Sequence, residues 1–203
     1  MTESLSNISK EHNTGSPEFS QFFRPLKTIH VSETVNPLRT KKDFIRKKTP
    51  EDAKNRGVMD YGGSFFIYLN GEPINFRLGG NFITWFLGDD GKIEEPAQAA
   101  EFDSYEVRRV VSDDMVFKKR GKEKKSAISL AAILSMVKKQ PKGEKGDLHN
   151  DSSFDNFFFV YDKDNQLRLV ICVWTGQCWA LGAAPVNGSS KLSAGSLLFL
   201  PKE

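Results

Sequence analysis

The residues of this chain best suited to a chemical function are its clustered Lys and Arg side chains. The densest run is KKRGKEKK at 118–125, and LRTKKDFIRKK at 38–48 is a second basic stretch. Clustered cations release counterions when they meet a polyanion, so such blocks are typical of surfaces that contact a phosphate backbone. The predicted phosphate-binding residues are Lys41, Lys42, Arg46, Lys47, Lys48, Arg108, Arg109, Lys118, Lys119, Arg120, Lys122, Lys124 and Lys125.

The small net charge of +3 hides a strong segregation of charge along the chain. Residues 108–147 carry a net charge of +7, from twelve Lys and Arg and five Asp and Glu. Residues 61–107 carry a net charge of −6, from two Lys and Arg and eight Asp and Glu. Two other interpretations of the basic block stay open. It would also serve as a solvated loop, which Glu123 interrupts, and the +7 segment would also complement the −6 segment within the chain or between copies.

Aromatic side chains are the second kind of candidate, because exposed rings stack on unpaired bases. Phe66 and Tyr68 lie on the face of a predicted strand that is opposite its apolar side chains. We therefore predict that these two residues contribute to nucleic-acid binding. For Trp85, Trp174 and Trp179 we expect packing in the core or at its rim.

The cysteines and histidines favour no reaction. If Trp174-Thr175-Gly176 forms a three-residue loop, Cys172 lies opposite Cys178, whereas a four-residue loop pairs Val173 with Cys178 and separates the two cysteines. We expect two reduced, buried thiols. The histidines are too scattered for a metal site, so we predict no metal and no cofactor. We expect His149 to be a solvated loop residue, and no nucleophile is paired with a base, so the protein is not expected to be an enzyme.

The strongest local signal is the hairpin SFFIYL-NG-EPINFRL at 64–78. Asn70-Gly71 supplies the positive φ angles of a two-residue turn. One face of the hairpin is apolar and should face the core. The predicted cross-strand pairs are Leu69 with Glu72, Ile67 with Ile74, and Phe65 with Phe76.

One amphipathic helix is predicted at 125–141, where Ser126 can cap the start and Pro141 ends the apolar stripe. The run LRLVICVW is almost entirely apolar and predicts a central strand that is covered on both faces. At 97–102 helix and strand both stay open. The other predicted strands are 81–87, 92–95, 104–111, 115–119, 154–161, 178–186 and 196–201.

These elements predict an α+β fold that is mostly antiparallel β. We expect a barrel or sandwich of about eight or nine short strands with one helix near 126–139. Residues 1–20 are predicted to be a disordered tail, 21–57 a basic and partly ordered arm, and 58–203 a single globular β-rich domain.

The last quarter of the chain, FFFVYDKDNQLRLVICVWTGQCWALGAA followed by LSAGSLLF, shows a pattern of hydrophobic strands, tight turns and Trp-containing strands. It resembles the C-terminal pattern of small uncharacterised β-proteins of candidate-phylum bacteria. Leu192 stands where those proteins tend to have a second Trp. The resemblance implies a compact bacterial β-module and no particular activity.

These observations favour a non-enzymatic binding module that contacts single-stranded DNA or RNA through basic blocks and exposed aromatics. The alternative is a protein-interaction or assembly subunit, homo-oligomers included, that docks through its N-terminal arm and its segregated charges. The longest apolar runs fall short of the 18 residues of a membrane span, so no membrane contact is expected. The first 20 residues are polar, so we expect no secretory signal and a cytoplasmic protein.

Overall fold

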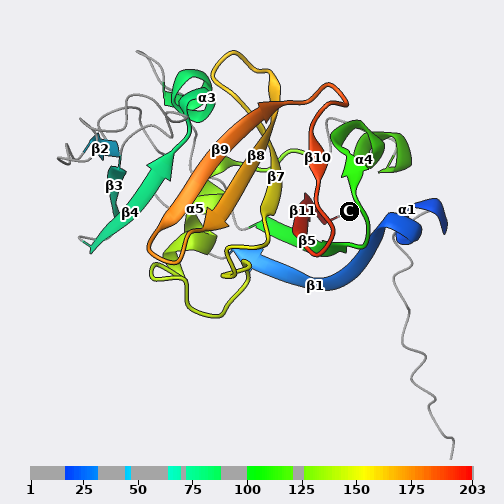
Figure 1. The fold of residues 1–203 in the computed structure, drawn as a ribbon, viewed down its shortest axis with the longest axis horizontal. Coiled ribbons are helices and arrows are strands. Elements are labelled where there is room, and N and C mark those ends of the chain that lie inside the picture. The colour runs from blue at the N-terminus through cyan, green and yellow to red at the C-terminus, as the bar shows by residue number, and fades with distance from the viewer. Residues whose placement is uncertain are drawn as a thin grey trace, which may run out of the picture.

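A computed structural model describes residues 17–31, 44–46, 64–69, 72–87, 100–120 and 126–202. Nine of its strands form one sheet, in the order β1-β5-β11-β7-β8-β9-β4-β3-β2 (Figure 1). The strands are β1 (Phe23–Val31), β2 (Phe44–Arg46), β3 (Ser64–Leu69), β4 (Glu72–Leu78), β5 (Ala100–Val107), β6 (Val111–Ser112), β7 (Asn156–Tyr161), β8 (Leu167–Trp174), β9 (Trp179–Pro185), β10 (Lys191–Leu192) and β11 (Leu197–Pro201). The helical segments are α1 (Pro17–Phe22), α3 (Gly80–Phe82), the π-helix η2 (Ile83–Leu87), α4 (Asp113–Arg120) and α5 (Leu130–Lys138).

The predicted α+β class is confirmed. Neighbouring strands are antiparallel except where β11 lies beside β7 and where β4 lies beside β9. The strand order of the described sheet has two ends, β1 and β2, so this sheet is not a closed barrel. β6 and β10 form a separate antiparallel pair.

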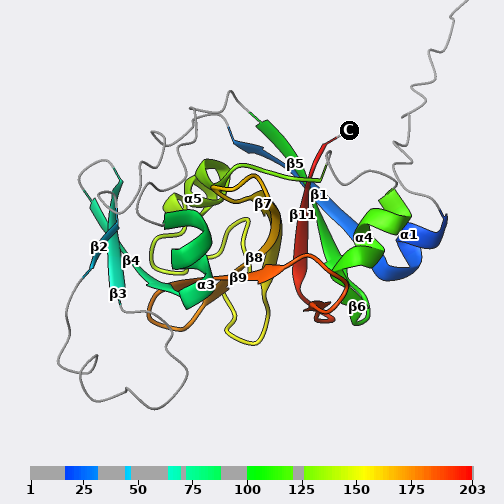
Figure 2. The same cartoon turned by 90° about the horizontal axis from the view of Figure 1, so that it is seen from above.

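The two faces of the sheet bury two different hydrophobic clusters. On one face, α5, α3 and η2 pack against the sheet, and on the other face α1 and α4 do so. Figure 2 shows α5 and α3 on one side of β7 and β11 and the pair α4 and α1 on the other. β8 lies between β7 and β9 and contributes Val170 to the first cluster and Leu169 to the second, which confirms its prediction as a central strand.

Strand β1 forms one end of the sheet and contributes to both clusters because it contains a β-bulge. The register with β5 shifts between Pro25 and Lys27. A bulge adds one residue, so the side chains beyond it point to the opposite face. Phe23 is accordingly buried in one cluster and Ile29 in the other. Residues of the predicted arm thus form an integral strand of the sheet.

Several local predictions are confirmed. β3 and β4 pair as the hairpin predicts, with Phe65 opposite Phe76, Ile67 opposite Ile74 and Leu69 opposite Glu72. β5 is a strand from Ala100 to Val107, so residues 100–102 of the segment at 97–102, where helix and strand were both open, form a strand. The helix predicted near 126–139 is α5.

The cap of α5 is a correction. Ser129 caps the helix, because its side chain accepts a hydrogen bond from the backbone N–H of Ala132 at 3.1 Å. Ser126 is buried upstream of the helix, where the chain runs along β7 and Ile128 N–H donates to the Phe159 carbonyl at 2.8 Å. Tertiary pairing with β7 therefore delays the start of the helix.

The predicted strand at 81–87 is wrong, because this segment is helical in α3 and η2. Short apolar runs fit a buried helix as well as a strand. Phe82 and Phe86 stack at a centroid distance of 4.9 Å, which is the contact that helical i, i+4 spacing brings about. Gly79 is the N-cap residue of α3.

The predicted strand at 115–119 is wrong as well, because α4 covers this segment. Two features of the sequence favour the helix. Asp113 and Asp114 lie at its positive N-terminal end. Lys118 and Asp114 form an i, i+4 ion pair at 2.6 Å.

The predicted strand at 92–95 lies outside the described residues. None of the helices in the described ranges is both long and apolar enough to cross a membrane.

A buried carboxylate in the β7–β8 turn, Asp162, pairs with Arg168 of β8, which also packs on Trp85 of η2. The side chain of Asp162 is fully buried and accepts hydrogen bonds from the backbone N–H groups of Asp164 and Gln166 and from Arg168 Nε, the last at 2.6 Å. The Arg168 guanidinium also lies 4.1 Å from the centre of the Trp85 ring. A buried carboxylate that loses its cation is strongly destabilising.

We therefore expect Arg168→Gln to lower the free energy of unfolding by about 3 kcal/mol, because it leaves the Asp162 carboxylate buried without a cation. Lys163→Gln is the matched control, since Lys163 is exposed and lies 3.7 Å from Asp164, and it should change stability by less than about 0.5 kcal/mol. Urea unfolding measures both. Equal effects of the two variants would contradict the assignment.

Candidate nucleic-acid interface

The structure describes the side chains of three of the predicted site residues, Arg108, Arg109 and Lys118. Lys41, Lys42, Lys47, Lys48, Lys122, Lys124 and Lys125 lie outside the described residues. Arg46 is in β2, Phe66 and Tyr68 are in β3, and Lys119 and Arg120 are in α4, but the side chains of these five lie outside the description.

The three described cations lie at the end of the molecule where α1 and α4 pack on the sheet. Arg108 Nη1 donates to the Ser20 carbonyl at 3.3 Å, and the guanidinium of Arg109 lies 4.3 Å from the centre of the Phe22 ring. Both arginines are exposed. Lys118 is the cation of the ion pair with Asp114 described above. The structure thus brings Arg108 and Arg109 together beside the start of β1.

Strand β1 adds two exposed cations that the sequence prediction did not select. Arg24 is paired with Glu106 on β5, and Lys27 Nζ lies 2.6 Å from Asp147 in the loop between α5 and β7. The side chains of Arg24 and Lys27 are still 58% and 51% exposed. Their positions on an edge strand are the reason, because a charged side chain there stays in contact with water.

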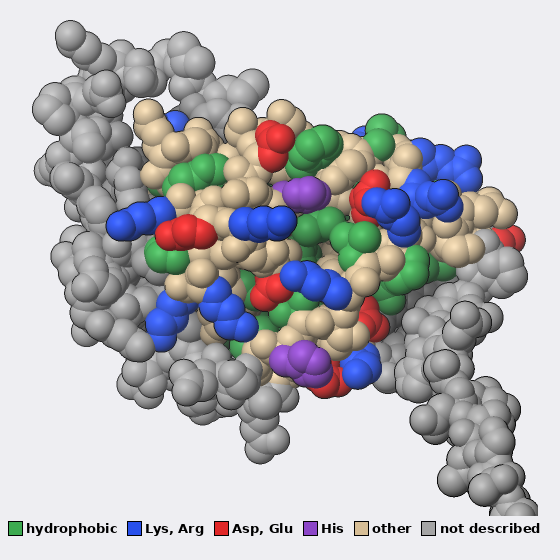
Figure 3. All heavy atoms as spheres, turned by 90° about the horizontal axis from the view of Figure 1, so that it is seen from below, with side chains coloured by type: hydrophobic (Ala, Val, Ile, Leu, Met, Phe, Trp, Pro, Cys, Tyr) green, Lys and Arg blue, Asp and Glu red, His purple; other side chains and the backbone are tan. Residues whose placement is uncertain are grey.

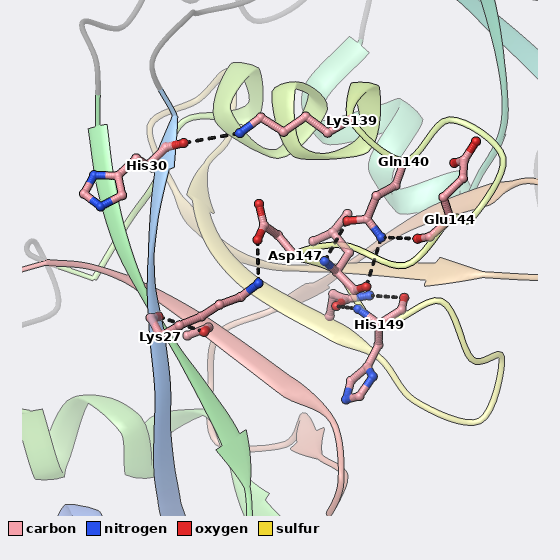
Figure 4. A network of polar contacts seen from close by, with 10 residues as sticks. Lys27, His30, Lys139, Gln140, Glu144, Asp147 and His149 are labelled. Atoms are coloured by element: carbon pink, nitrogen blue, oxygen red, sulfur yellow. Dashed lines mark hydrogen bonds and ion pairs between the residues drawn. The ribbon is translucent and has the colours of Figure 1, made fainter.

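The loop between α5 and β7 carries three further exposed lysines, Lys139, Lys142 and Lys145. Lys139 Nζ donates to the carbonyl of His30 in β1 at 3.3 Å, so this loop lies against the far end of β1 (Figure 4). Glu144 accepts a hydrogen bond from the backbone N–H of Lys142 at 2.8 Å and is the acid nearest in sequence to these lysines.

The buried amide of Gln140 holds the start and end of this loop together (Figure 4). Gln140 Nε2 donates to the carbonyls of Glu144 and Leu148 at 2.6 and 3.1 Å, and Gln140 Oε1 accepts from Leu148 N–H at 2.8 Å. The backbone carbonyl of Gln140 accepts from Trp179 Nε1 at 2.7 Å. Because each of these polar groups is satisfied, the loop presents its lysines from a defined backbone.

Together these cations form a surface that we call the β1 basic face. It consists of Arg24, Lys27, Arg108, Arg109, Lys139, Lys142 and Lys145. Figure 3 shows the molecule from below, over β1 and the α5–β7 loop, where Lys and Arg side chains gather with acidic side chains between them. The high positive charge of residues 108–147 is the sequence signal that could have indicated the three loop lysines. Only the packing of the loop on β1 brings them near Arg24 and Lys27.

The described aromatic residues are used in packing, as expected for the three tryptophans. Trp179 is fully buried, and the ring of Trp174 packs edge-on against it at 5.4 Å. Trp85 lies under Arg168. Among described residues, the large hydrophobic side chains that are exposed are Leu26 and Val110. The described part of the β1 basic face therefore offers contacts to phosphates and no exposed Phe, Tyr or Trp ring for a base.

The expectation of two reduced, buried cysteines is confirmed, since Cys172 and Cys178 are buried and free. Trp174 pairs with Trp179 across a four-residue loop, which places Cys172 opposite Leu181 and separates the two sulfurs. Burial raises the pKa of the Cys172 thiol far above its ordinary value, so this group stays neutral and unreactive.

The expectation of a solvated His149 is wrong, because the ring is half-buried in a packed turn. His149 Nε2 lies 3.1 Å from the Gly195 carbonyl, and its ring packs against Phe154 at 5.3 Å. The backbone of His149 is held by the buried side chain of Asn156, with hydrogen bonds of 2.8 and 3.1 Å. His149 is thus a structural residue of the loop.

A half-buried carboxyl group, Asp155, lies beside two serines where β11 begins. Ser193 Oγ donates to Asp155 Oδ2 at 3.2 Å, and Ser196 Oγ accepts from Asp155 N–H at 3.0 Å and lies 2.8 Å from Ser193 Oγ. Desolvation raises the pKa of Asp155 above its ordinary value of 3.8, and the Ser193 hydrogen bond offsets this only in part. Within the described ranges, His, Cys, Asp and Glu side chains form no group of three or more suited to a metal ion.

Comparisons of this chain with protein-family models, with curated proteins and with solved structures find no match. The resemblance of the last quarter of the chain to small β-proteins of candidate-phylum bacteria therefore stays an untested expectation.

Gly143 is a position where the lysine-bearing loop admits no side chain. Its φ is +70°, and a Cβ there would lie 2.2 Å from Trp174 Cε2. We expect Gly143→Ala to destabilise the protein by about 3 kcal/mol, from the left-handed backbone and the clash together. Gly176→Ala is the control, because Gly176 has φ +85° but open space around it, and should cost about 1 kcal/mol. Thermal unfolding distinguishes the two, and equal losses would show that the contact with Trp174 is unimportant.

The raised pKa of Asp155 predicts a pH dependence of stability with a defined sign. The folded state binds this proton more tightly than the unfolded state, so the stabilisation is complete below pH 3.8 and is lost as the pH rises through the folded pKa. Asp155→Asn should therefore gain stability relative to wild type as the pH rises from 3 to 7, measured by urea unfolding.

Asp151 provides the control of opposite sign. The backbone and side-chain hydrogen bonds from Ser153 lower the pKa of Asp151. Its stabilisation is present above its ordinary pKa of 3.8 and is lost as the pH falls through the lower folded value. Asp151→Asn should therefore be less stable than wild type at pH 7 and equal to it at the lowest pH. The same slope for both variants would contradict the two assignments.

Proposed function

We propose that this protein is a non-enzymatic module that binds single-stranded nucleic acid, RNA or DNA, through its phosphate backbone. The observation that carries the proposal is the β1 basic face, where seven exposed Lys and Arg residues from three chain segments lie on and beside one strand. Its cations would displace the counterions of a polyanion, and this release is favourable at low salt.

The predicted basic residues at 39–48 and 118–125 would extend this interface, and Phe66 and Tyr68 would hold bases. These contributions are proposals that the described side chains do not test. The assembly alternative calls for an exposed apolar patch, and no observation on the described surface favours it beyond the isolated exposure of Leu26 and Val110.

The proposal predicts a steep and site-dependent effect of salt. Each phosphate contact to a single strand contributes a slope of about −0.7 to log K against log salt concentration. The double substitution Lys142→Gln/Lys145→Gln should therefore make the slope shallower by about 1.4 and weaken binding at low salt. Fluorescence anisotropy with a labelled 12-nucleotide oligonucleotide at several salt concentrations measures both quantities.

The matched control is Lys163→Gln/Lys191→Gln, which removes the same charge from exposed lysines outside the β1 basic face. This pair should leave the slope unchanged. An equal effect of the two double variants would show that only net charge matters, and absence of binding at low salt would contradict the proposed function. A variant with all Lys and Arg of 118–125 changed to Gln tests whether this block adds further contacts.

A further inference from the structure

The cations of the β1 basic face fall into two groups at opposite ends of β1. One group, the α1 end, is formed by Arg108 and Arg109, which contact α1 beside the start of the strand. The other, the loop end, is formed by Lys139, which contacts the carbonyl of His30 near the end of the strand, and by the exposed Lys142 and Lys145, which follow it in the same loop. Figure 3 shows Lys and Arg side chains gathered at both sides of this face.

The centre of the face is different, because its cations are already neutralised by carboxylates of the same chain. Glu106 pairs with Arg24, and Asp147 pairs with Lys27. The five cations of the two ends have no carboxylate within ion-pair distance among the described residues. The attraction for a phosphate is therefore concentrated at the ends, with a weakly charged stretch between them.

The separation of the two ends follows from the length of β1. The strand has nine residues, and with a rise of about 3.3 Å per residue it spans about 26 Å. Successive phosphates of one stacked strand lie about 3.4 Å apart along the helix axis, so a strand that reaches from one end to the other needs about eight nucleotides.

We propose that the ligand is a stacked nucleic acid strand of about eight nucleotides or more, held at both ends of β1 at once. This inference rests on the proposed function and adds the size and the bivalent binding mode of the ligand. When one end is bound, the other phosphates of the same strand are held near the second end at a high effective concentration. A shorter strand occupies only one end and lacks this gain.

The inference predicts a step in affinity with oligonucleotide length. Oligoadenylates of 4, 8, 12 and 16 nucleotides, whose bases stack, are titrated with the full-length protein at low salt and followed by fluorescence anisotropy. A four-nucleotide site can be placed in roughly nine registers on a 12-nucleotide strand, which alone would raise the affinity about ninefold. Because binding at both ends adds to this, we expect the affinity to rise by at least about 100-fold from 4 to 12 nucleotides. From 12 to 16 nucleotides only a small further gain is expected.

Variants of each end show whether the step depends on both. Arg108→Gln/Arg109→Gln and Lys142→Gln/Lys145→Gln should each reduce the gain from 4 to 12 nucleotides to about ninefold, since one site is left. The control Lys163→Gln/Lys191→Gln should retain the whole step. Thermal unfolding shows whether each variant is folded. If one variant fails to fold, the other still tests whether the step in affinity needs both ends.

Neutral substitutions of the central acids provide a test of opposite sign. Glu106→Gln/Asp147→Asn frees Arg24 and Lys27, so the centre becomes a third cationic group. This variant should bind the 4-nucleotide ligand more tightly than wild type does, by about tenfold, and show a smaller step. No change in the affinity for this ligand would contradict the inference that Glu106 and Asp147 neutralise the centre of the face.

The outcomes separate this inference from the function on which it rests. Binding that increases with length only in proportion to the number of registers overturns the bivalent mode and leaves nucleic-acid binding standing. Absence of binding at every length overturns the proposed function itself. A step that persists unchanged in both end variants would place the two contacts elsewhere on the protein and would overturn the inference.

Discussion

Burial of both faces of the central strands is the constraint on which the rest of this structure depends. In β7, Phe157 and Phe159 face one hydrophobic cluster, and Phe158 and Val160 face the other. β11 does the same with Leu198 and Leu200 on one side and Leu197 and Phe199 on the other. A strand that is apolar at every position must be covered on both faces, so helices are required on each side of the sheet.

The basic surface is a consequence of how the edge of this sheet is completed. β1 pairs with β5 on one side only, and a bulge lets it bury Phe23 in one cluster and Ile29 in the other. The strand is therefore fixed by the core although Arg24 and Lys27 remain in solvent. Edge strands with charged side chains and a bulge resist pairing with other strands, so the features that expose the cations also protect the edge.

Local sequence patterns predicted the elements whose stability is local. The register of the β3–β4 hairpin follows from Asn70-Gly71, and α5 follows from its apolar stripe. The segments at 81–87 and 115–119 were predicted wrongly as strands, because their short apolar runs fit both periods and tertiary packing decided between them. The same limit applies to the site: Arg108 and Arg109 were recognised as cations, but their place beside Phe22 depends on α1 packing against the sheet.

The sequence by itself determined the α+β class, the central position of β8, the buried state of the two cysteines and the segregation of charge along the chain. These depend on composition and on periodicity within short segments, both of which are visible without coordinates. Only the tertiary structure decided that β1 belongs to the sheet and that its bulge lets it contribute to both hydrophobic clusters. It also decided that Lys139 lies at the end of β1 opposite Arg108 and Arg109. Such contacts join residues far apart in the chain, and their positions follow from the packing of whole elements, which no local pattern encodes.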